Sequence, residues 1–469
     1  MTQVRRPTPV RKRSPLPALG IGALLLVGGL AGGTAYIGSQ TVTAQEDLAK
    51  NIKTAVEATG YAQVKSSTYD RGFMNSTQTM NIVLGLKGES KPVGLTLINH
   101  IQHGPLPGFK AVGQAVIDSE VKFTDAALQT KFEAALKGQK PTIRTVVGLG
   151  GATSSQIEVP AGSLTEQGTT VSWQALMGDV QNAGLTGSAD LSWPEFKVVG
   201  DGVNMTISGV SVKGNTVKQS LSDPLAVGDQ TLRIGSIRVA GSSGGQAGTV
   251  SIKDMALVSK SSVMGGFYNG ALSYDIGQAD IDSPGAVAQS FKNAQLRLSM
   301  NHLSREPLVR LLALVNSLNE KNRAAGSSAA SGLASLSAAQ RKAATDDALA
   351  LLKAQPVLSV DRLSLVRPEG ELVLSARAEI PGAAKLNAES VQMLTQAPAL
   401  GVGMLKLQAQ FKGPDAALRG LLGTIAPSVT SSLDGLIQAG FLKKQGRDLV
   451  SDLSLNEGKP TINGQAMGQ

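Results

Sequence analysis

Apolar and polar positions alternate along most of the segment 61–303, in short runs that are rich in Val, Ile, Leu and Thr. Gly, Pro, Asn, Asp and Ser interrupt these runs at intervals of roughly ten residues, a spacing typical of turns between short strands. At 93–98 and 203–208, for example, an apolar side chain occupies every second position. A period of two places those side chains on one face of a strand. We therefore expect a long antiparallel β-rich meander over 61–303.

Between 304 and 355 the apolar residues recur at intervals of three and four, which is the period of a helix. A stripe of this kind covers 308–318 and follows Pro307, a residue suited to the first turn of a helix. A connector rich in Gly, Ser and Ala at 324–337 separates it from a second predicted helix at 338–352. We therefore expect a helical insert with a flexible connector over 304–355.

The remaining part of the chain, 356–469, returns to the strand pattern, and its clearest alternation is at 405–412. Short helices are predicted after Pro414 and Pro427, because apolar residues again recur there at helical spacing. This part is expected to form a C-terminal β/α section. Together the patterns predict a mainly β protein of the β-rich α+β class. We expect an extended, twisted antiparallel β-structure on which several long helices pack.

The first 60 residues have a different character, because no charged residue occurs from 14 to 45. The most apolar part, 16–38, is long enough to cross a hydrocarbon core as a helix, which needs roughly 20 residues. We predict an N-terminal transmembrane signal anchor there, with the basic head 1–15 kept in the cytoplasm by its five cations. A juxtamembrane helix is predicted at 39–60. The protein is thus expected to be a single-pass inner-membrane protein whose bulk is periplasmic.

Two features of this segment leave alternatives open. The small residues of Val42-Thr43-Ala44 would suit cleavage after Ala44, although the apolar run is longer than that of a usual signal peptide and favours a retained anchor. Small residues spaced four apart would let two anchor helices pair in a homodimer, unless they are only the glycines common in membrane helices. These residues are Gly28, Gly29, Gly32 and Gly33.

Composition narrows the possible partners. Aromatic residues make up only 3% of the chain, and much of the net charge of +9 comes from the basic head, so no nucleic-acid partner is expected. Cysteine is absent. Disulfides, thiolate nucleophiles and thiolate metal sites are therefore excluded. No cofactor is predicted.

Candidate catalytic groups are few. His100 and His103 are three residues apart in a predicted strand, where an odd offset sends side chains to opposite faces, so no metal site is expected. His103 is expected at a strand-ending turn, with one hydrogen bond to the backbone. The segment 241–245 matches the G-x-S-x-G pattern, but it precedes no predicted helix, and only His302 follows as a base. Acidic pairs such as Asp280 and Asp282 are typical of a solvated surface. We therefore predict that the protein is not an enzyme.

Two short motifs carry a family resemblance: Tyr69-Asp70-Arg71-Gly72 with Ser76 after it, and the triplet at 103–105. With the anchor before them, the chain resembles the YdgA-like family of bacterial inner-membrane-anchored envelope proteins of unknown function, whose patterns are Y-x-R-G with a following Ser and HGP. The matching residues are Tyr69, Arg71, Gly72, Ser76, His103, Gly104 and Pro105. The resemblance implies a β-rich periplasmic domain and no established catalytic role. Structural roles are expected for these residues, with Arg71 held beside the Tyr69 ring, and a binding role is the alternative.

Three functions are consistent with these features. The first is non-enzymatic handling of a lipid or another hydrophobic ligand, because a large sheet with many Leu, Val and Ala side chains can leave an apolar groove. The second is a structural or scaffolding role, in which sheet edges dock partner proteins, with the chain as a homodimer. The third, a hydrolase, lacks a recognisable set of nucleophile, base and oxyanion donors. The first is the prediction we favour.

Overall fold

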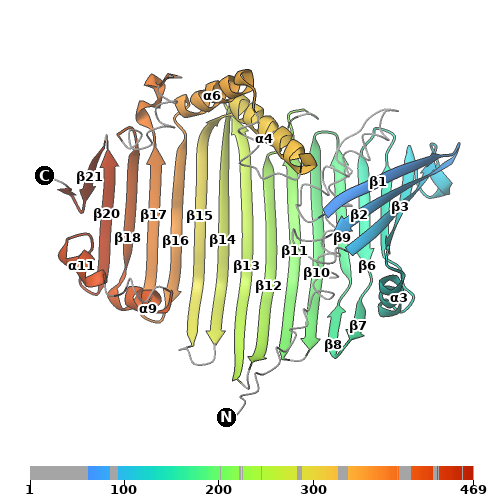
Figure 1. Cartoon of the computed structure of the whole chain (residues 1–469), viewed down its shortest axis with the longest axis horizontal. Coiled ribbons are helices and arrows are strands. Elements are labelled where there is room, and N and C mark those ends of the chain that lie inside the picture. Colours follow the sequence, from blue (N-terminus) through green and yellow to red (C-terminus); the bar gives the residue numbers. More distant parts are fainter. Residues whose placement is uncertain are drawn as a thin grey trace, which may run out of the picture. The chain divides into compact units, whose positions relative to one another are not determined.

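The computed structural model describes residues 62–467 except 85–92, 201, 221–222, 224, 244–245, 283–287, 326–335, 388, 390–402, 426–429, 431 and 457. Within these ranges the protein is mainly β, and its strands belong to one large antiparallel sheet (Figure 1). The chain divides into two compact units. Unit 1 contains Met1–Asn182 and Trp193–Asp201, and unit 2 contains Ala183–Ser192 and Gly202–Gln469. Strand β10 (Thr186–Gly200) contributes residues to both.

Unit 1 is a meander of short strands. Pairing runs from β1 through β6 to β9, and β7 and β8 form a hairpin beside β10. The strands are β1 (Ala62–Arg71), β2 (Asn75–Leu84), β3 (Val93–His103), β4 (Ala115–Phe123), β5 (Thr142–Val147), β6 (Thr153–Val159), β7 (Gly162–Glu166), β8 (Thr169–Trp173) and β9 (Leu176–Ala183). A short 3-10 helix, η1 (Pro107–Phe109), lies in the loop between β3 and β4.

Helix α3 (Ala126–Ala135) packs on the sheet of unit 1 through Phe132, whose ring meets Phe123 edge-on at 5.2 Å and stacks near Trp173 at 6.4 Å. The sequence pattern predicted only strands here, and that expectation is wrong for 126–135. The helix is short and Ala-rich, so its apolar stripe is too sparse to show a period. The Asp125 side chain accepts hydrogen bonds from the first backbone N–H groups of the helix, and this N-cap is the signal that could have located it.

Unit 2 is a sheet of long strands in which each strand pairs with the next from β11 to β18, and β18 pairs with β20. The strands are β11 (Val203–Val217), β12 (Gly228–Ser243), β13 (Gln246–Met264), β14 (Phe267–Asp282), β15 (Gln289–Ser304), β16 (Val357–Arg367), β17 (Gly370–Glu379), β18 (Lys406–Pro414), β19 (Lys443–Gln445), β20 (Asp448–Asn456), β21 (Lys459–Ile462) and β22 (Gln465–Ala466). The strand predicted at 203–208 is confirmed within β11, and the one predicted at 405–412 is confirmed by β18, which begins at Lys406.

Helices lie at the ends of these strands (Figure 1). They are α4 (Arg305–Ala325), α6 (Ala338–Lys353), η2 (Pro381–Lys385), α9 (Asp415–Ile425) and α11 (Leu433–Gln438). Helices α4 and α6 contact each other and β15, and α9 contacts β17 and β18. The predicted helices at 308–318 and 338–352 are confirmed by α4 and α6. The helix predicted after Pro427 is confirmed from Leu433 by the short helix α11, and 426–429 and 431 lie outside the described residues.

A row of unusual backbone positions crosses five neighbouring strands of unit 2. Gly209, Gly235, Asp254, Gly277 and Asn293 lie opposite one another on β11 to β15. Asp254 and Asn293 have φ of 54° and 48°, and Gly209 has φ of 65°. A left-handed residue inside a strand acts like the extra residue of a β-bulge. After it, the odd and even positions of the strand exchange faces. We call these five residues the bulge row.

The pattern of apolar residues changes phase at the bulge row. On β13 the apolar side chains stand at even positions before it, as at Val250 and Ile252, and at odd positions after it, as at Met255 and Leu257. On β14 the same change occurs between Ile276 and Ala279. The phase change lets strands of up to 19 residues keep their apolar side chains on one face.

No helix within the described ranges has both the length and the apolar character needed to cross a membrane. The predicted anchor 16–38, the juxtamembrane helix 39–60 and the pairing residues Gly28, Gly29, Gly32 and Gly33 lie outside those ranges.

Candidate functional site

An open apolar groove lies on the sheet of unit 2, across β13 to β18. Its volume is about 590 Å³. Most of the lining side chains are aliphatic or small, and two cations, Lys260 and Arg377, also line the groove. The large apolar side chains of the lining are Tyr268, Leu272, Leu298, Met300, Leu358, Val360 and Leu407. A cavity of this size and character is suited to a small apolar ligand.

The register of the sheet explains how the groove forms. Two cross-strand rows contribute most of its lining, one through Leu272, Leu298 and Val360 and the other through Met300 and Leu358. On β17 these rows continue through alanine, at 376 and 378, and a large side chain returns at Leu407 on β18, opposite Ala378. The floor is therefore hollow beside a wall of Leu, Met and Val side chains. The five spacings of about 4.8 Å between β13 and β18 give the groove a length of roughly 24 Å.

The ring of Tyr268 forms one end of the groove. A Cβ atom at Gly270 would stand 3.1 Å from the Tyr268 hydroxyl oxygen, so the ring lies over the glycine on the same strand. Nearby, His302 stacks on Phe267 at 3.8 Å and its Nδ1 lies 2.5 Å from the carbonyl oxygen of Ala354. This contact ties the end of β15 to the segment that leads from α6 into β16.

The motif residues lie in unit 1, at the end of the sheet where β1, β2 and β3 meet. Tyr69 and Arg71 end β1, Ser76 begins β2, and His103 ends β3. The backbone N–H of His103 donates to the carbonyl oxygen of Met74 at 2.7 Å, which holds the two turns side by side. The structure therefore brings together the two motifs that are separated in the sequence.

A hydrogen bond between side chains joins the motifs. The Oγ atom of Ser76 lies 2.8 Å from Nε2 of His103, and the backbone N–H of Gly72 donates to the same oxygen at 3.3 Å. Burial lowers the pKa of His103, and the positive charge of Arg71 lowers it further. In a neutral ring the tautomer decides whether Nε2 accepts the serine proton or donates its own to the serine oxygen. The expected backbone hydrogen bond from the His103 ring is thus replaced by one to a serine, because β2 places Ser76 beside the end of β3.

This Ser-His pair has the separation that lets an imidazole remove a serine proton. Ser76, however, is only 4% exposed, so its hydroxyl is closed to a substrate. Gly72 has a structural reason to be glycine, because a Cβ there would stand 2.0 Å from the carbonyl oxygen of Asn75. Gly104 has φ of 111°, a conformation that other residues rarely adopt, and Pro105 follows it in the loop after β3. These features indicate a structural role, in which the motif residues fix the conformation of the two turns.

Other candidate residues are dispersed. His100 is exposed on β3, and no three side chains of His, Asp or Glu come together as a metal site in the described part of the chain. The described residues of 241–245 lie in the hairpin from β12 to β13. Asp280 accepts hydrogen bonds from Ser290 and Gln278 at 2.7 Å each. None of these groups faces the groove.

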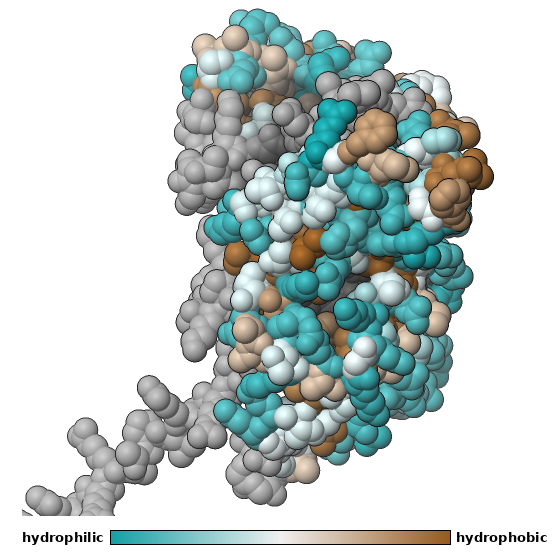
Figure 2. All heavy atoms as spheres, turned by 90° about the vertical axis from the view of Figure 1, so that its right-hand side faces the viewer, coloured by the Kyte–Doolittle hydropathy of each residue, from teal (hydrophilic) through white to brown (hydrophobic). Residues whose placement is uncertain are grey.

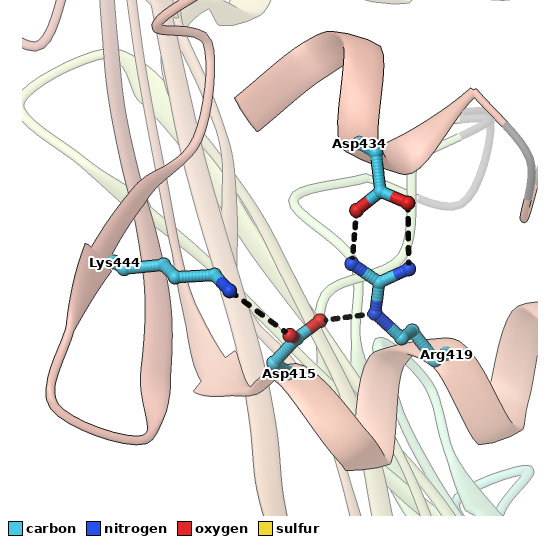
Figure 3. A network of polar contacts seen from close by, with 4 residues as sticks. All are labelled: Asp415, Arg419, Asp434 and Lys444. Atoms are coloured by element: carbon cyan, nitrogen blue, oxygen red, sulfur yellow. Dashed lines mark hydrogen bonds and ion pairs between the residues drawn. The ribbon is translucent and has the colours of Figure 1, made fainter. Parts of the chain in front are cut away.

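The sequence analysis missed a charged network that joins α9 to α11 (Figure 3). Arg419 lies at the centre, with Nε 2.7 Å from Asp415 and Nη2 2.6 Å from Asp434. Lys444 approaches the second oxygen of Asp415 at 3.8 Å. The hydrogen bond from Arg419 is the main cause that lowers the pKa of Asp434. Only the Asp415 to Arg419 spacing, four residues on one helix, was visible in the sequence.

The chain was compared with protein families, curated proteins and solved structures. A family model described as bacterial protein of unknown function (DUF945) matches residues 16–468. No curated protein and no solved structure matches the chain. Because the match covers nearly the whole sequence, the chain belongs to this bacterial family of unknown function, DUF945.

Proposed function

We propose that the protein binds the acyl chain of a lipid in the groove of unit 2 and handles that lipid in the bacterial envelope. One observation carries the proposal: large aliphatic side chains stand open to solvent in adjacent rows of one sheet. Leu358 is 51% exposed, and Leu272 and Met300 are each 37% exposed. Covering such side chains with an acyl chain removes apolar surface from water at roughly 25 cal/mol per Å².

The shape of the groove supports an elongated ligand. Its volume of about 590 Å³ lies within the range of small-molecule sites, about 300 to 1,000 Å³. The rows run across the strands, so the hollow is long and shallow. Strongly polar side chains that would orient a compact polar substrate do not dominate its lining, which favours an acyl chain over a sugar or a nucleotide.

The proposal places this activity at the inner membrane. The uncharged segment 16–38 would anchor the chain, with the basic head in the cytoplasm and both units in the periplasm. The resemblance of the motifs to the YdgA-like family supports the same placement. An anchored protein with an apolar groove would meet lipid at the surface to which it is tethered. We propose no catalytic step, cofactor or nucleic-acid partner.

Binding can be tested with the full chain, delipidated in a short-chain detergent and titrated with a fluorescent fatty acid and a fluorescent phospholipid. Leu358→Glu places a charge in the middle of the groove and should reduce affinity at least about tenfold, which corresponds to 1.4 kcal/mol. Because Leu358 is half exposed, this substitution should leave the fold intact.

Leu363→Glu is the matched control. Leu363 lies on the same strand, β16, is 46% exposed, and is not part of the groove lining. The proposal expects the control to bind like the wild-type chain. If neither probe binds, or if both variants lose affinity equally, the groove is not a lipid site.

A further inference from the structure

Three turns at one end of unit 1 carry exposed apolar side chains. The turns are 72–74 between β1 and β2, 104–114 between β3 and β4, and 148–152 between β5 and β6. They are neighbours, because Gln114 donates from its backbone N–H to Val147 at 2.7 Å and from its side-chain amide to Leu149 at 2.9 Å. The large apolar residues of these turns, which we call the apolar tips, are Phe73, Met74, Leu106, Phe109, Val112 and Leu149.

The apolar tips are far more exposed than apolar residues usually are. Phe73 is 99% exposed and Phe109 is 92% exposed, so almost nothing in the described part of the chain packs on either ring. All six exceed half exposure. Isolated apolar residues on a surface are ordinary, whereas a group on adjacent turns marks an interaction site. Figure 2 shows the side of the molecule on which β1 to β3 lie in Figure 1, where apolar side chains form separate groups among hydrophilic ones.

The backbone holds Phe109 outward at an energetic cost. Its φ is 57°, in the left-handed region that bulky residues rarely adopt, and Gly108 before it has φ of 56°. Buried Pro107 and hydrogen bonds from the N–H groups of Phe109 and Lys110, each 3.1 Å long, fix this conformation. Backbone strain of this kind is concentrated at functional sites, and here it keeps the Phe109 ring exposed to solvent.

The charges around the apolar tips indicate the kind of surface that would cover them. Lys110 is the only charged residue in the three turns, and none of them contains Asp or Glu. Its Nζ lies 2.9 Å from Asp118 on β4, and Asp118 also contacts Arg144 at 2.9 Å, so two cations share this one carboxylate beside the turns. Arg71, which is exposed, directly precedes the first turn. A surface that is apolar in depth and negative at its rim, such as a phospholipid bilayer with anionic head groups, is complementary to this pattern.

We propose that the apolar tips insert into the interface of a phospholipid membrane and dock unit 1 on it. The side chains sit on three turns and are more than half exposed, which suits insertion into a fluid layer better than packing on a rigid protein surface. Rings of Phe and side chains of Leu, Met and Val would enter the boundary between head groups and acyl chains, and Lys110 would remain among the head groups. This inference does not depend on the groove of unit 2.

Tryptophan reporters in the full chain test the proposal. Phe109→Trp and Phe73→Trp are each reconstituted in vesicles of phosphatidylcholine and phosphatidylglycerol whose acyl chains carry bromine, which quenches nearby indole rings. Insertion to a depth of about 5 to 10 Å should quench the added Trp at least about twofold more than in unbrominated vesicles. The native Trp173 and Trp193 are buried, so the wild-type chain supplies the background.

Met177→Trp is the control, because Met177 is exposed on β9 and pairs with Glu158 at the opposite end of the same sheet. Its emission should not respond to bromine. Equal quenching at positions 109 and 177, or none at 109 and 73, would overturn the proposal. A blue-shifted emission without quenching would also overturn it, because a protein surface, such as a second copy of this chain, would then cover the tips.

Discussion

The hydrogen bond between Ser76 and His103 shows what single residues do in this fold. The sequence marked both as motif residues, but their partnership depends on the register of β2 and β3, which pairs Ser76 with Ile101. His103 lies two residues beyond Ile101, just before the chain turns at Gly104, and its ring reaches back to the serine. The motif residues could thus be identified from the sequence. The contact between Ser76 and His103 could not be predicted, because a shift of one residue in the strand register would separate the two side chains.

We predict that His103 titrates below 6.5 in the folded chain, because burial and the charge of Arg71 lower its pKa. Between that pKa and 6.5 the unfolded chain binds a proton that the folded chain does not, so the free energy of unfolding falls as the pH drops. NMR titration of the imidazole signals checks the pKa, and only three histidines need assignment. Arg71→Gln should move the pKa of His103 upward, although it should stay below 6.5 because burial remains.

His103→Gln isolates the stability effect. The difference in free energy of unfolding between the wild-type chain and this variant should increase with pH through the window just below 6.5 and be constant above it. A His103 pKa at or above 6.5, or a difference that does not vary with pH in that window, would contradict the assignment of a neutral ring.

At the scale of elements, the sequence predicted most strands and the long helices, because their apolar periods extend over many residues. The bulge row was not predicted. Each strand taken alone shows only a local break in alternation, such as the one near Gly235, and only the register reveals that five breaks lie in one line. The row is therefore a property of the assembled sheet.

The bulge row should be sensitive to added volume. A Cβ atom at Gly277 would stand 2.9 Å from Cβ of Asp254 on the neighbouring strand, which is closer than real contacts allow. Gly277→Val should therefore destabilise the fold by about 1 to 3 kcal/mol. Gly241→Val on β12 is the control, because the nearest atom to its Cβ is 3.4 Å away. Denaturant unfolding measures both variants. Equal stability of the two would show that the strands separate freely at the row.

The charged network at Arg419 should fix one short helix rather than the whole fold. Ion pairs at a surface contribute little to global stability. Arg419→Gln removes the bonds from Arg419 to Asp415 and Asp434, so the amides of α11 should exchange with solvent faster while the global unfolding transition hardly moves. Arg447→Gln serves as the control, because Arg447 lies 3.9 Å from its nearest carboxylate. Unchanged exchange in α11 would mean that apolar packing of Leu433 alone holds it.

At the scale of the whole molecule, apolar burial is unevenly distributed. Most fully buried apolar side chains belong to unit 1, including both tryptophans, whereas no described residue of β11 to β14 is fully buried. Composition and the two-residue period of apolar side chains predicted a mainly β protein, but they did not reveal the difference in burial between the two units. Apolar and polar residues alternate in the same way in a sheet whose face is covered and in one whose face is open. The described helices of unit 2 contact β15, β17 and β18, and β11 to β14 rely on pairing along their length.

This uneven burial gives a prediction for the two units in the full chain. A lipid that binds only the folded groove stabilises the fold around it by RT ln(1 + [L]/Kd), about 2.7 kcal/mol at a hundredfold excess over Kd. Fatty acid should therefore slow hydrogen exchange in β14 to β16 of unit 2. The thermal transition seen by emission of Trp173 and Trp193, both in unit 1, should stay in place.

Leu358→Glu should abolish the protection of β14 to β16, and Leu363→Glu should retain it. Protection without a shift in tryptophan emission requires that the two units open independently, which their separate sets of buried side chains lead us to expect. If fatty acid raised both transitions together, the units would unfold as one cooperative body. If it protected neither, the exposed rows of Leu and Met on the open sheet would need a different occupant.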